Sequence, residues 1–389
     1  MLKTSRALKA TVVAGLTFGL ITAGASAANA EPVPSGFRTY AAVGSDTIQD
    51  VYNELSNTYF TSIASYNAFP AGTITTKSGI SAFARPAGSG DGVKALSASW
   101  STTSNTFTNA DGVTSPALQS GSIHAVDIAR SSSRPGTSVA PGGSTDKLVF
   151  VPLARDAVSV AIQGVGLTGV PTNFTTAELH AIFIGTSAGN VTAGSGSTDP
   201  VYNKPGGGTI TLHPELPQAS SGTRSFFLKA IGQGADPIGA WVEQIGSPEN
   251  NASTLGTAGD ISPFSVAQWN AQKAGLGDTI TGAPNGSTLK ITSVNSKATN
   301  LPTGLGDTST IYGDLQSEPS SAVGTFARDV YSVVPTANYT GTLATLINSS
   351  LRDASHLVGG NPKYVVNDYG FGRIVYTASE GEYHSNWTN

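Results

Sequence analysis

Short apolar runs rich in β-branched residues alternate along this chain with segments of helical periodicity, and that alternation most constrains its fold. The apolar runs predict buried strands at Lys147 to Val160, Thr209 to Leu212 and Val330 to Val334. The helical patterns are Ile48 to Tyr59, Gly92 to Ser97, Thr176 to Phe183, Ser225 to Ile231 and Val266 to Ala274. Strands that alternate with helices favour α/β layering over a β-sandwich. The Gly-rich connection from Ser187 to Gly208 is expected to be an exposed loop.

Composition excludes several classes of function. The chain has no cysteine, so disulfides, iron–sulfur clusters, Cys-ligated zinc and thiol nucleophiles are excluded. Its formal charge of −4 lacks the basic excess of a nucleic-acid-binding surface. The five histidines show neither HxxxH nor HExxH spacing, so we expect no metal site and no cofactor. Charged residues make up only 12% of the chain, which suits a secreted protein.

The N-terminus has the pattern of a secretory signal peptide. A basic start with Lys3, Arg6 and Lys9 precedes an apolar stretch from Ala10 to Ala25, and Ala28-Asn29-Ala30 fits a small-x-small cleavage site. Glycines within the apolar stretch weaken the alternative of a permanent membrane anchor. We therefore expect residues 1–30 to be removed near Ala30, leaving a secreted chain with no lipid anchor at this end and no stable membrane insertion.

Three short elements place small polar residues directly ahead of a predicted helix. They are Gly44-Ser45-Asp46-Thr47, Gly88-Ser89-Gly90-Asp91-Gly92 and Ser220-Ser221-Gly222-Thr223. A helix N-terminus exposes unpaired N–H groups and the positive end of the helix dipole, so it can hold an anion. The same residue types are also good helix caps, which is the alternative interpretation of each element. Three such elements together indicate a converging oxyanion site.

In order and surroundings these elements resemble phosphate-binding proteins of ABC importers, a family with the type II periplasmic-binding fold. The first element and the helix after it resemble the family's opening anion loop, the second its GSSGGV-type loop, and Ser221-Gly222-Thr223 its SGT loop. Further similar segments are Val126 to Ser133, Leu179 to Gly185, and Gly259 to Ile261 with Val266 to Trp269. The match covers most of the chain after residue 30.

The resemblance implies an α/β fold of two lobes with a ligand cleft between them. Lobe I would comprise residues 31–153 plus 332–389, and lobe II residues 154–331. Carried over position by position, the ligand-binding residues are Asp46, Thr47, Ser89, Ser131, Ser221, Gly222 and Thr223. Loops of both lobes would then hold the anion.

Two departures from the family concern charge. The family's "GASD" carboxylate, which accepts a hydrogen bond from the protonated ligand, falls on Ser132, which could still be a ligand as a hydroxyl. Asp46, where the family usually has Thr, is expected to replace that carboxylate, although it could instead cap the helix at Ile48.

The family's arginine before the SGT loop falls on Pro217. The missing positive charge is therefore expected from Arg224, Arg130 or Arg134.

The preferred function is a secreted, non-catalytic oxyanion-binding protein, most simply for inorganic phosphate, acting in uptake or scavenging. An ABC importer permease would be its partner in uptake, although the missing lipid anchor departs from that picture. Two alternatives stay open: an extracellular hydrolase or phosphatase on the same scaffold, and a surface interaction protein that has lost the small ligand. A hydrolase needs a base or metal beside its nucleophile, and the sequence predicts no such catalytic cluster.

Overall fold

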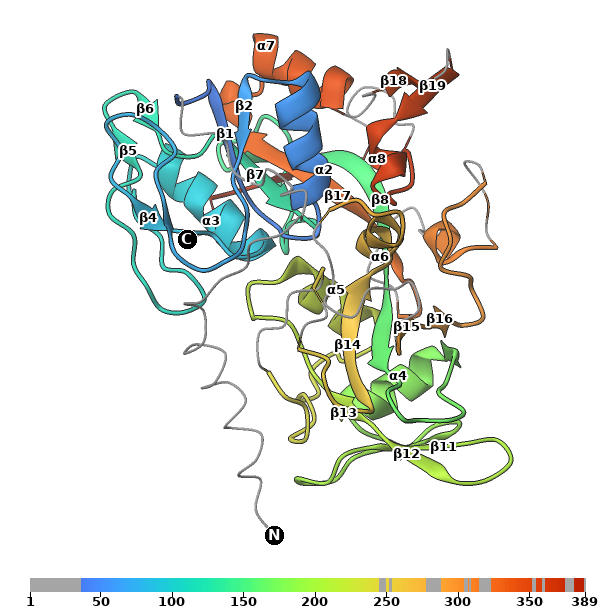
Figure 1. Cartoon of the computed structure of the whole chain (residues 1–389). Coiled ribbons are helices and arrows are strands. Elements are labelled where there is room, and N and C mark those ends of the chain that lie inside the picture. The colour runs from blue at the N-terminus through green and yellow to red at the C-terminus, as the bar shows by residue number, and fades with distance from the viewer. Residues whose placement is uncertain are drawn as a thin grey trace, which may run out of the picture.

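Two long antiparallel strands, β8 (Leu148–Gln163) and β17 (Ala327–Pro335), run through the middle of the molecule (Figure 1). The computed structural model describes residues 36–244, 250–251, 254–277, 288–303, 307, 309–314, 323–351, 355–358, 361–374 and 381–387. The predicted signal peptide at residues 1–30 lies outside this range. Within it, no helix combines the length and hydropathy that crossing a membrane requires.

The central sheet is mixed and has the order β13-β14-β8-β17-β7-β1-β2, with β15 and β20 also paired to β8. Its other strands are β1 (Tyr40–Gly44), β2 (Ile63–Ser65), β7 (Ile128–Ser131), β13 (His213–Pro214), β14 (Asp260–Ser265), β15 (Leu289–Ile291) and β20 (Tyr383–Ser385). Residues 148–157 of β8 pair with β17, whereas residues 158–163 pair with β14 and β15. The sheet therefore has two halves, and β8 extends from one into the other.

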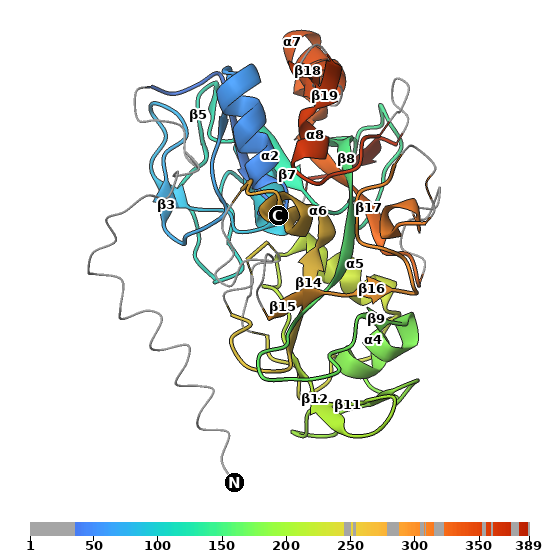
Figure 2. The same cartoon turned by 45° about the vertical axis from the view of Figure 1, so that its right-hand side comes forward.

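Helices cover both faces of this sheet, which confirms the expected α/β layering (Figures 1 and 2). They are α2 (Gln49–Glu54), α3 (Ser89–Trp100), α4 (Thr176–Phe183), α5 (Gly222–Ala230), α6 (Val266–Lys273), α7 (Gly341–Ala344) and α8 (Val365–Asp368). Short π-helical segments follow at Leu55–Tyr59 and Thr345–Leu351, and 3₁₀ segments at Ile311–Asp314 and Thr336–Asn338.

The core explains why β8 is mostly apolar on either side of Arg155 and Asp156. Val149 and Val151 pack with α2 and α8 in one cluster, whereas Leu148 and Phe150 pack with α3 in another. Farther along, Val158 and Val160 join a third cluster with α4 and α5. A strand covered on both faces loses the polar alternation of a half-exposed strand. The division into lobes at residues 153 and 332 remains a prediction.

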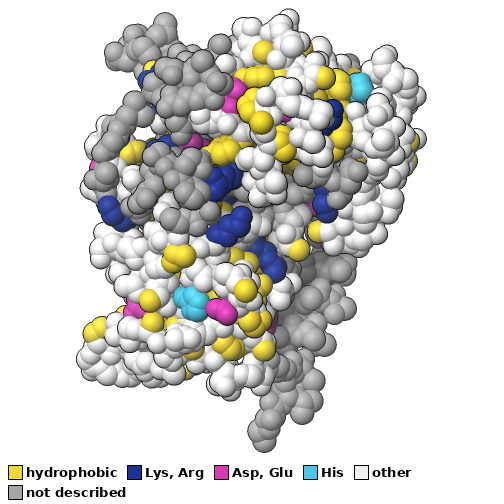
Figure 3. All heavy atoms as spheres, turned by 180° about the vertical axis from the view of Figure 1, so that it is seen from behind, with side chains coloured by type: hydrophobic (Ala, Val, Ile, Leu, Met, Phe, Trp, Pro, Cys, Tyr) yellow, Lys and Arg dark blue, Asp and Glu magenta, His cyan; other side chains and the backbone are white. Residues whose placement is uncertain are grey.

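Several two-stranded sheets lie outside the central sheet. They are β3 (Thr73–Ile74) with β4 (Phe83–Ala84), β5 (Gln119–Ser120) with β6 (Ile123–His124), β9 (Asn173–Phe174) with β16 (Ser293–Val294), and β18 (Ser355–Val358) with β19 (Asn361–Tyr364). The segment expected as an exposed loop, Ser187 to Gly208, instead contains β10 (Val191–Thr192) and β11 (Val201–Asn203). These pair with β12 (Thr209–Thr211) because buried Val191, Tyr202 and Ile210 reach the core. On the face seen in Figure 3, most of the described surface is white, the colour of the backbone and of side chains that are neither charged nor hydrophobic.

A close contact between two glycines sets the position of the first two anion elements. A Cβ at Gly92 in α3 would lie 2.6 Å from the Cα of Gly44, the last residue of β1. Gly44 has a φ of +109°, a conformation that side chains disfavour. The two glycines let α3 pack directly on the end of β1, which brings the N-terminus of α3 beside the loop that follows β1.

Candidate anion-binding site

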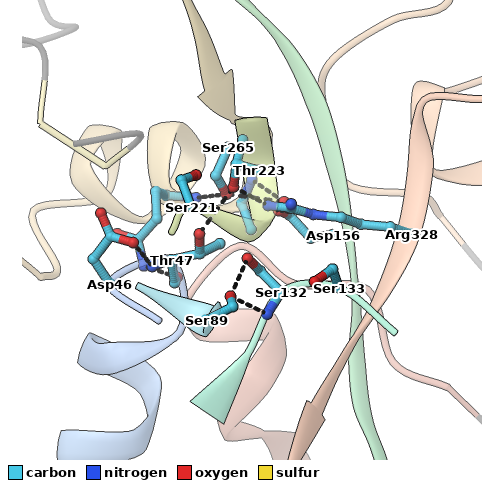
Figure 4. A network of polar contacts seen from close by, with 12 residues as sticks. Asp46, Thr47, Ser89, Ser132, Ser133, Asp156, Ser221, Thr223, Ser265 and Arg328 are labelled. Atoms are coloured by element: carbon cyan, nitrogen blue, oxygen red, sulfur yellow. Dashed lines mark hydrogen bonds and ion pairs between the residues drawn. The ribbon is translucent and has the colours of Figure 1, made fainter. Parts of the chain in front are cut away.

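Hydroxyl groups from four separate segments meet where the two halves of the sheet join (Figure 4). The Thr47 Oγ1 lies 3.2 Å from the Thr223 Oγ1, and the Ser89 Oγ lies 3.0 Å from the Ser132 Oγ. All four residues are at most 2% exposed. The structure therefore brings together residues from the three predicted anion elements and from the end of β7.

Gly222 stands between these segments. A Cβ at Gly222 would lie 2.6 Å from the Oγ atoms of both Ser89 and Ser132. The backbone N–H of Gly90 also donates to the Ser220 carbonyl oxygen at 2.9 Å. Glycine at position 222 therefore allows the N-terminus of α5 to approach the N-terminus of α3 across the site.

A buried ion pair joins the two long strands at this point. Arg328 of β17 faces Asp156 of β8 in the strand register. The Arg328 Nη2 donates to the Asp156 Oδ2 at 2.8 Å and to the Thr223 Oγ1 at 2.7 Å, and the Nε donates to the same carboxylate oxygen at 3.2 Å. The guanidinium thus points into the hydroxyl cluster (Figure 4).

The other oxygen of Asp156 is held by the N-terminus of α6. The Asp156 Oδ1 accepts from the Ser265 Oγ at 2.9 Å and from the Ala267 backbone N–H at 3.1 Å. Both carboxylate oxygens are therefore engaged, and the carboxylate fixes the orientation of the Arg328 guanidinium.

One nitrogen of Arg328 is left for another group. Arg328 is only 2% exposed, and its buried Nη1 has no hydrogen-bond partner among the described residues. A buried donor without an acceptor costs about 1–3 kcal/mol, and more when it is charged. An anion in the hydroxyl cluster would supply the missing acceptor.

Asp46 is fully buried beside this cluster. Its Oδ1 accepts from the Thr47 backbone N–H at 3.0 Å, and its carbonyl oxygen accepts from the Asn250 Nδ2 at 3.3 Å. The N-cap of α2 is Ile48, whose own side chain makes no capping hydrogen bond. The Asp46 carboxylate bonds to the N–H of the residue just before that N-cap, and its role as ligand selector or as cap remains a prediction.

Two predicted ligands make local contacts instead. The Ser221 Oγ accepts from the Arg224 backbone N–H at 3.0 Å, so Ser221 caps α5. The Ser131 hydroxyl donates to the Ser133 carbonyl oxygen at 2.6 Å. Ser131 therefore shapes the turn after β7 rather than joining the hydroxyl cluster.

None of the three arginines expected to supply the positive charge has its guanidinium in the hydroxyl cluster. Arg224 donates to the Pro217 carbonyl oxygen at 2.9 Å and to the Gln244 Oε1 at 2.5 Å. Arg134 lies over the Tyr383 ring, 5.5 Å from its centroid. The positive charge at the cluster comes instead from Arg328. The pairing of β17 with β8 places this residue beside Thr223, which lies 105 residues earlier in the chain.

Arg130 stabilises the loop after β1 through hydrogen bonds to backbone carbonyl oxygens. Its fully buried guanidinium donates to the carbonyl oxygens of Gly44, Ser45 and Tyr66 at 3.1, 3.2 and 2.6 Å. It also donates to the Ser65 Oγ at 2.8 Å. Arg130 therefore holds the loop that carries Asp46 and Thr47 from behind.

Sequence reasoning missed Arg328 and Asp156, although a signal for them exists. An Arg-Asp dipeptide interrupts each long buried strand, as Arg155-Asp156 in β8 and as Arg328-Asp329 in β17. In the antiparallel register Arg155 faces Asp329 and Arg328 faces Asp156. Because side chains alternate between the faces of a strand, one pair lies on each face of the sheet. The sequence alone does not say which pair faces the anion loops.

The described residues contain no group of three His, Asp or Glu side chains placed to hold a metal ion. The site is thus built from hydroxyls, helix N-termini, one guanidinium and buried carboxylates. These groups suit an oxyanion.

No family model matches the sequence, and no curated protein matches it significantly. Solved structures do resemble it. A proposed phosphate ABC transporter substrate-binding protein with bound phosphate, from Clostridium perfringens, is 14% identical with a TM-score of 0.49 and covers 86% of this chain and 99% of its own.

An ABC-type phosphate transport receptor from Vibrio cholerae is 13% identical, with a TM-score of 0.44 and the same two coverages. A human phosphate-binding apolipoprotein is 12% identical, with a TM-score of 0.44, and covers 86% of this chain and 90% of its own. At these scores the function has to be argued from the geometry of the site.

Proposed function

We propose that this protein is a non-catalytic receptor for a tetrahedral oxyanion, and that inorganic phosphate is its ligand. The observation that carries the proposal is the buried Arg328 Nη1, which has no acceptor among the described residues and belongs to a guanidinium fixed by Asp156. Arginine presents a planar fork of donors that matches a tetrahedral oxyanion. The hydroxyls of Thr47, Ser89 and Thr223 add donors around it.

Binding rather than hydrolysis is supported by the partners of the site hydroxyls. Among the described residues, these hydroxyls contact one another, the Ser132 backbone N–H and Arg328, which is no base at neutral pH. The histidines at positions 124, 180, 213 and 384 bond to groups elsewhere. A serine nucleophile would need a base within hydrogen-bond reach. The hydrolase remains the second candidate, and it predicts release of alcohol from a phosphate ester.

The protein would act outside the cytoplasm, after removal of residues 1–30, in uptake or scavenging of its ligand. An ABC importer permease would be its partner in uptake. The remaining alternative, a surface interaction protein, predicts no affinity for any oxyanion.

Replacing Thr223 by Val removes one hydroxyl while keeping the shape of the side chain. The hydroxyl lies 2.7 Å from the Arg328 Nη2 and would contact the anion. A lost charge-assisted hydrogen bond of about 1.5–3 kcal/mol lowers phosphate affinity by about tenfold or more. Isothermal titration calorimetry measures this change.

Thr176→Val is the matched control, since Thr176 opens α4 and its hydroxyl contacts Asn295 far from the cluster. Its phosphate affinity should equal that of the parent. If Thr223→Val also binds phosphate as tightly as the parent, the Thr223 hydroxyl takes no part in binding.

An anion held by loops from both halves of the sheet should bring those halves together. Gly90 and Ser220 already form one contact between these loops. Because phosphate would bind the closed arrangement better than an open one, it should shift the population toward closure. Small-angle X-ray scattering should show a smaller radius of gyration with saturating phosphate. An unchanged profile at proven saturation would indicate a rigid site.

A further inference from the structure

A cavity of about 460 Å³ lies at the carboxyl-terminal ends of two helices that begin beside the proposed anion site. α6 begins where the Ala267 backbone N–H donates to Asp156, and α2 begins two residues after Thr47. Ala274, the C-cap of α6, belongs to the cavity wall, as does Tyr59, where the π-helical continuation of α2 ends. The helix dipoles that favour an anion at one end therefore favour a cation at the cavity.

The wall of this cavity comes from α2, α6, α8 and the segments that follow them. α8 lies beside α2 in both ribbon views (Figures 1 and 2), and a Cβ at Gly277 after α6 would lie 2.5 Å from the Asp50 Oδ2 in α2. The described wall residues are Ala274, Leu276 and Val365, which are apolar, and Glu54, Tyr59, Asp368 and Tyr369, which are polar. The volume falls within the roughly 300–1,000 Å³ that is usual for small-molecule sites.

Two carboxylates give the cavity a negative potential. Glu54 and Asp368 are half-buried, so neither residue is closed off from solvent. Burial, and then the charges of Glu54 and Asp368, raise the pKa of the Tyr59 hydroxyl above its usual value. The pKa of Tyr369 is also raised, first by burial and then by the charges of Glu54 and of two aspartates. A wall with this potential attracts a cation and repels an anion.

The two tyrosine rings favour the same charge. An aromatic ring attracts a cation over its face, because that face carries partial negative charge. The Tyr369 hydroxyl donates to the Glu54 carboxylate, which keeps a ring and a carboxylate together in the wall. A carboxylate has about four lone-pair positions, so Glu54 can accept further hydrogen bonds.

The remaining wall residues favour an organic cation over a metal ion. Leu276 and Val365 offer apolar surface, which suits an alkyl stem and supplies no oxygen ligand. Nowhere in the described part of the chain are three His, Asp or Glu side chains placed to hold a metal ion. A primary ammonium group has three N–H donors, which carboxylates accept. An alkyl chain ending in such a group therefore matches both kinds of wall residue.

We propose that this cavity binds a primary alkylammonium group, with its charged head at the Glu54 and Asp368 carboxylates. Its alkyl stem would lie against the Leu276 and Val365 side chains. Free alkylamines and the lysine side chain of another protein share this chemistry. The proposal does not depend on the anion site, which lies at the opposite ends of α2 and α6.

The test is a proton NMR titration of the whole chain with n-butylamine, Nα-acetyl-lysine methylamide and n-butanol, and with Ca²⁺ as a competitor at matched ionic strength. Both amines are charged at neutral pH, whereas n-butanol has the same chain without the charge. At least one amine should bind, and its methylene signals should shift upfield because tyrosine rings shield protons that lie over their faces. n-Butanol should not bind, and Ca²⁺ should not displace the amine.

Glu54→Gln removes one charge from the wall but keeps an acceptor for the Tyr369 hydroxyl. The loss of a charge-assisted hydrogen bond should lower amine affinity by about tenfold or more. Glu382→Gln is the matched control, because the Glu382 Oε1 also accepts from a tyrosine hydroxyl, that of Tyr339 at 2.8 Å, but lies outside the described wall. It should leave amine affinity unchanged.

Tyr59→Leu removes one ring while keeping apolar surface at the same place. It should lower amine affinity by about two- to fivefold and reduce the upfield shift.

Binding of the lysine compound alone would assign the site to a lysine of a partner protein, and binding of n-butylamine alone would assign it to a free amine. Either result supports the proposal. A parent that binds neither amine, or that binds n-butanol as tightly as n-butylamine, would overturn it. Displacement of the amine by Ca²⁺, or a Glu54→Gln variant that binds the amine no more weakly than Glu382→Gln, would overturn it as well.

Discussion

Arg328→Lys should lower phosphate affinity by about 100-fold, a loss of about 3 kcal/mol in binding free energy. Lysine keeps the positive charge but is a point charge without the planar fork of donors. In the native site the guanidinium serves the Asp156 carboxylate and the Thr223 hydroxyl and still has its Nη1 left over. One ammonium cannot reproduce that geometry and also reach the anion. Calorimetry gives the affinity, and a thermal melt shows that the variant is folded.

The chain contains its own control for this prediction. Arg155 pairs with Asp329 at 3.1 Å in the adjacent position of the same two strands, and its side chain is 26% exposed. Arg155→Lys makes the same chemical change away from the hydroxyl cluster and should leave phosphate affinity unaltered. Equal losses in the two variants would mean that the strand pair, rather than Arg328, determines binding, and an Arg328→Lys variant as tight as the parent would refute the proposed anion site.

Asp46→Asn should abolish most of the preference for phosphate over sulfate. Near neutral pH phosphate carries at least one proton and sulfate carries none. A buried carboxylate accepts from the protonated ligand and repels the unprotonated one, so it discriminates against sulfate. Asn can donate to either anion. We expect the ratio of the two affinities to fall by about tenfold or more, since the variant both loses repulsion and gains a donor.

Competition between sulfate and phosphate in calorimetry measures that ratio. Asp127→Asn is the matched control, because Asp127 is also a buried carboxylate but accepts from the Ala41 backbone N–H and pairs with Lys77. It should keep the parent's selectivity even if it melts earlier. If Asp46→Asn also keeps that selectivity, the carboxylate does not select the ligand, and Asp46 serves only to order its loop.

Helix N-termini were largely predictable because their causes are local. The predicted helix Thr176 to Phe183 is α4 residue for residue, and Thr175 and Glu178 form a capping box at its start. Gly88 and Ser221 are the N-caps of α3 and α5, so each helix begins three residues before the predicted start at Gly92 or Ser225. Capping depends on residues within one turn of the chain, so the sequence contains the whole pattern.

The strands predicted at residues 147–160, 209–212 and 330–334 lie where β8, β12 and β17 form, but their pairing was not predictable and neighbours such as β1 and β7 were missed. The apolar residues on either side of Arg155 and Asp156 mark β8 as buried on both faces, and this follows from composition within the strand. Which strand lies beside it depends on contacts between segments far apart in sequence. The same limit applied to the segment from Ser187 to Gly208, where glycine-rich composition concealed strands that the core supports.

The sequence by itself determined where the hydroxyls and helix N-termini of the site lie along the chain, because those patterns are short. Only the tertiary structure decided which charge joins them. Arg328 meets Asp156 across 172 residues of sequence, through a register that also sends Arg155 and Asp329 to the opposite face. A shift of that register by one residue would exchange the two faces. The charge of the site is thus set by long-range strand pairing, whose energy is distributed over the whole core, and no local pattern records it.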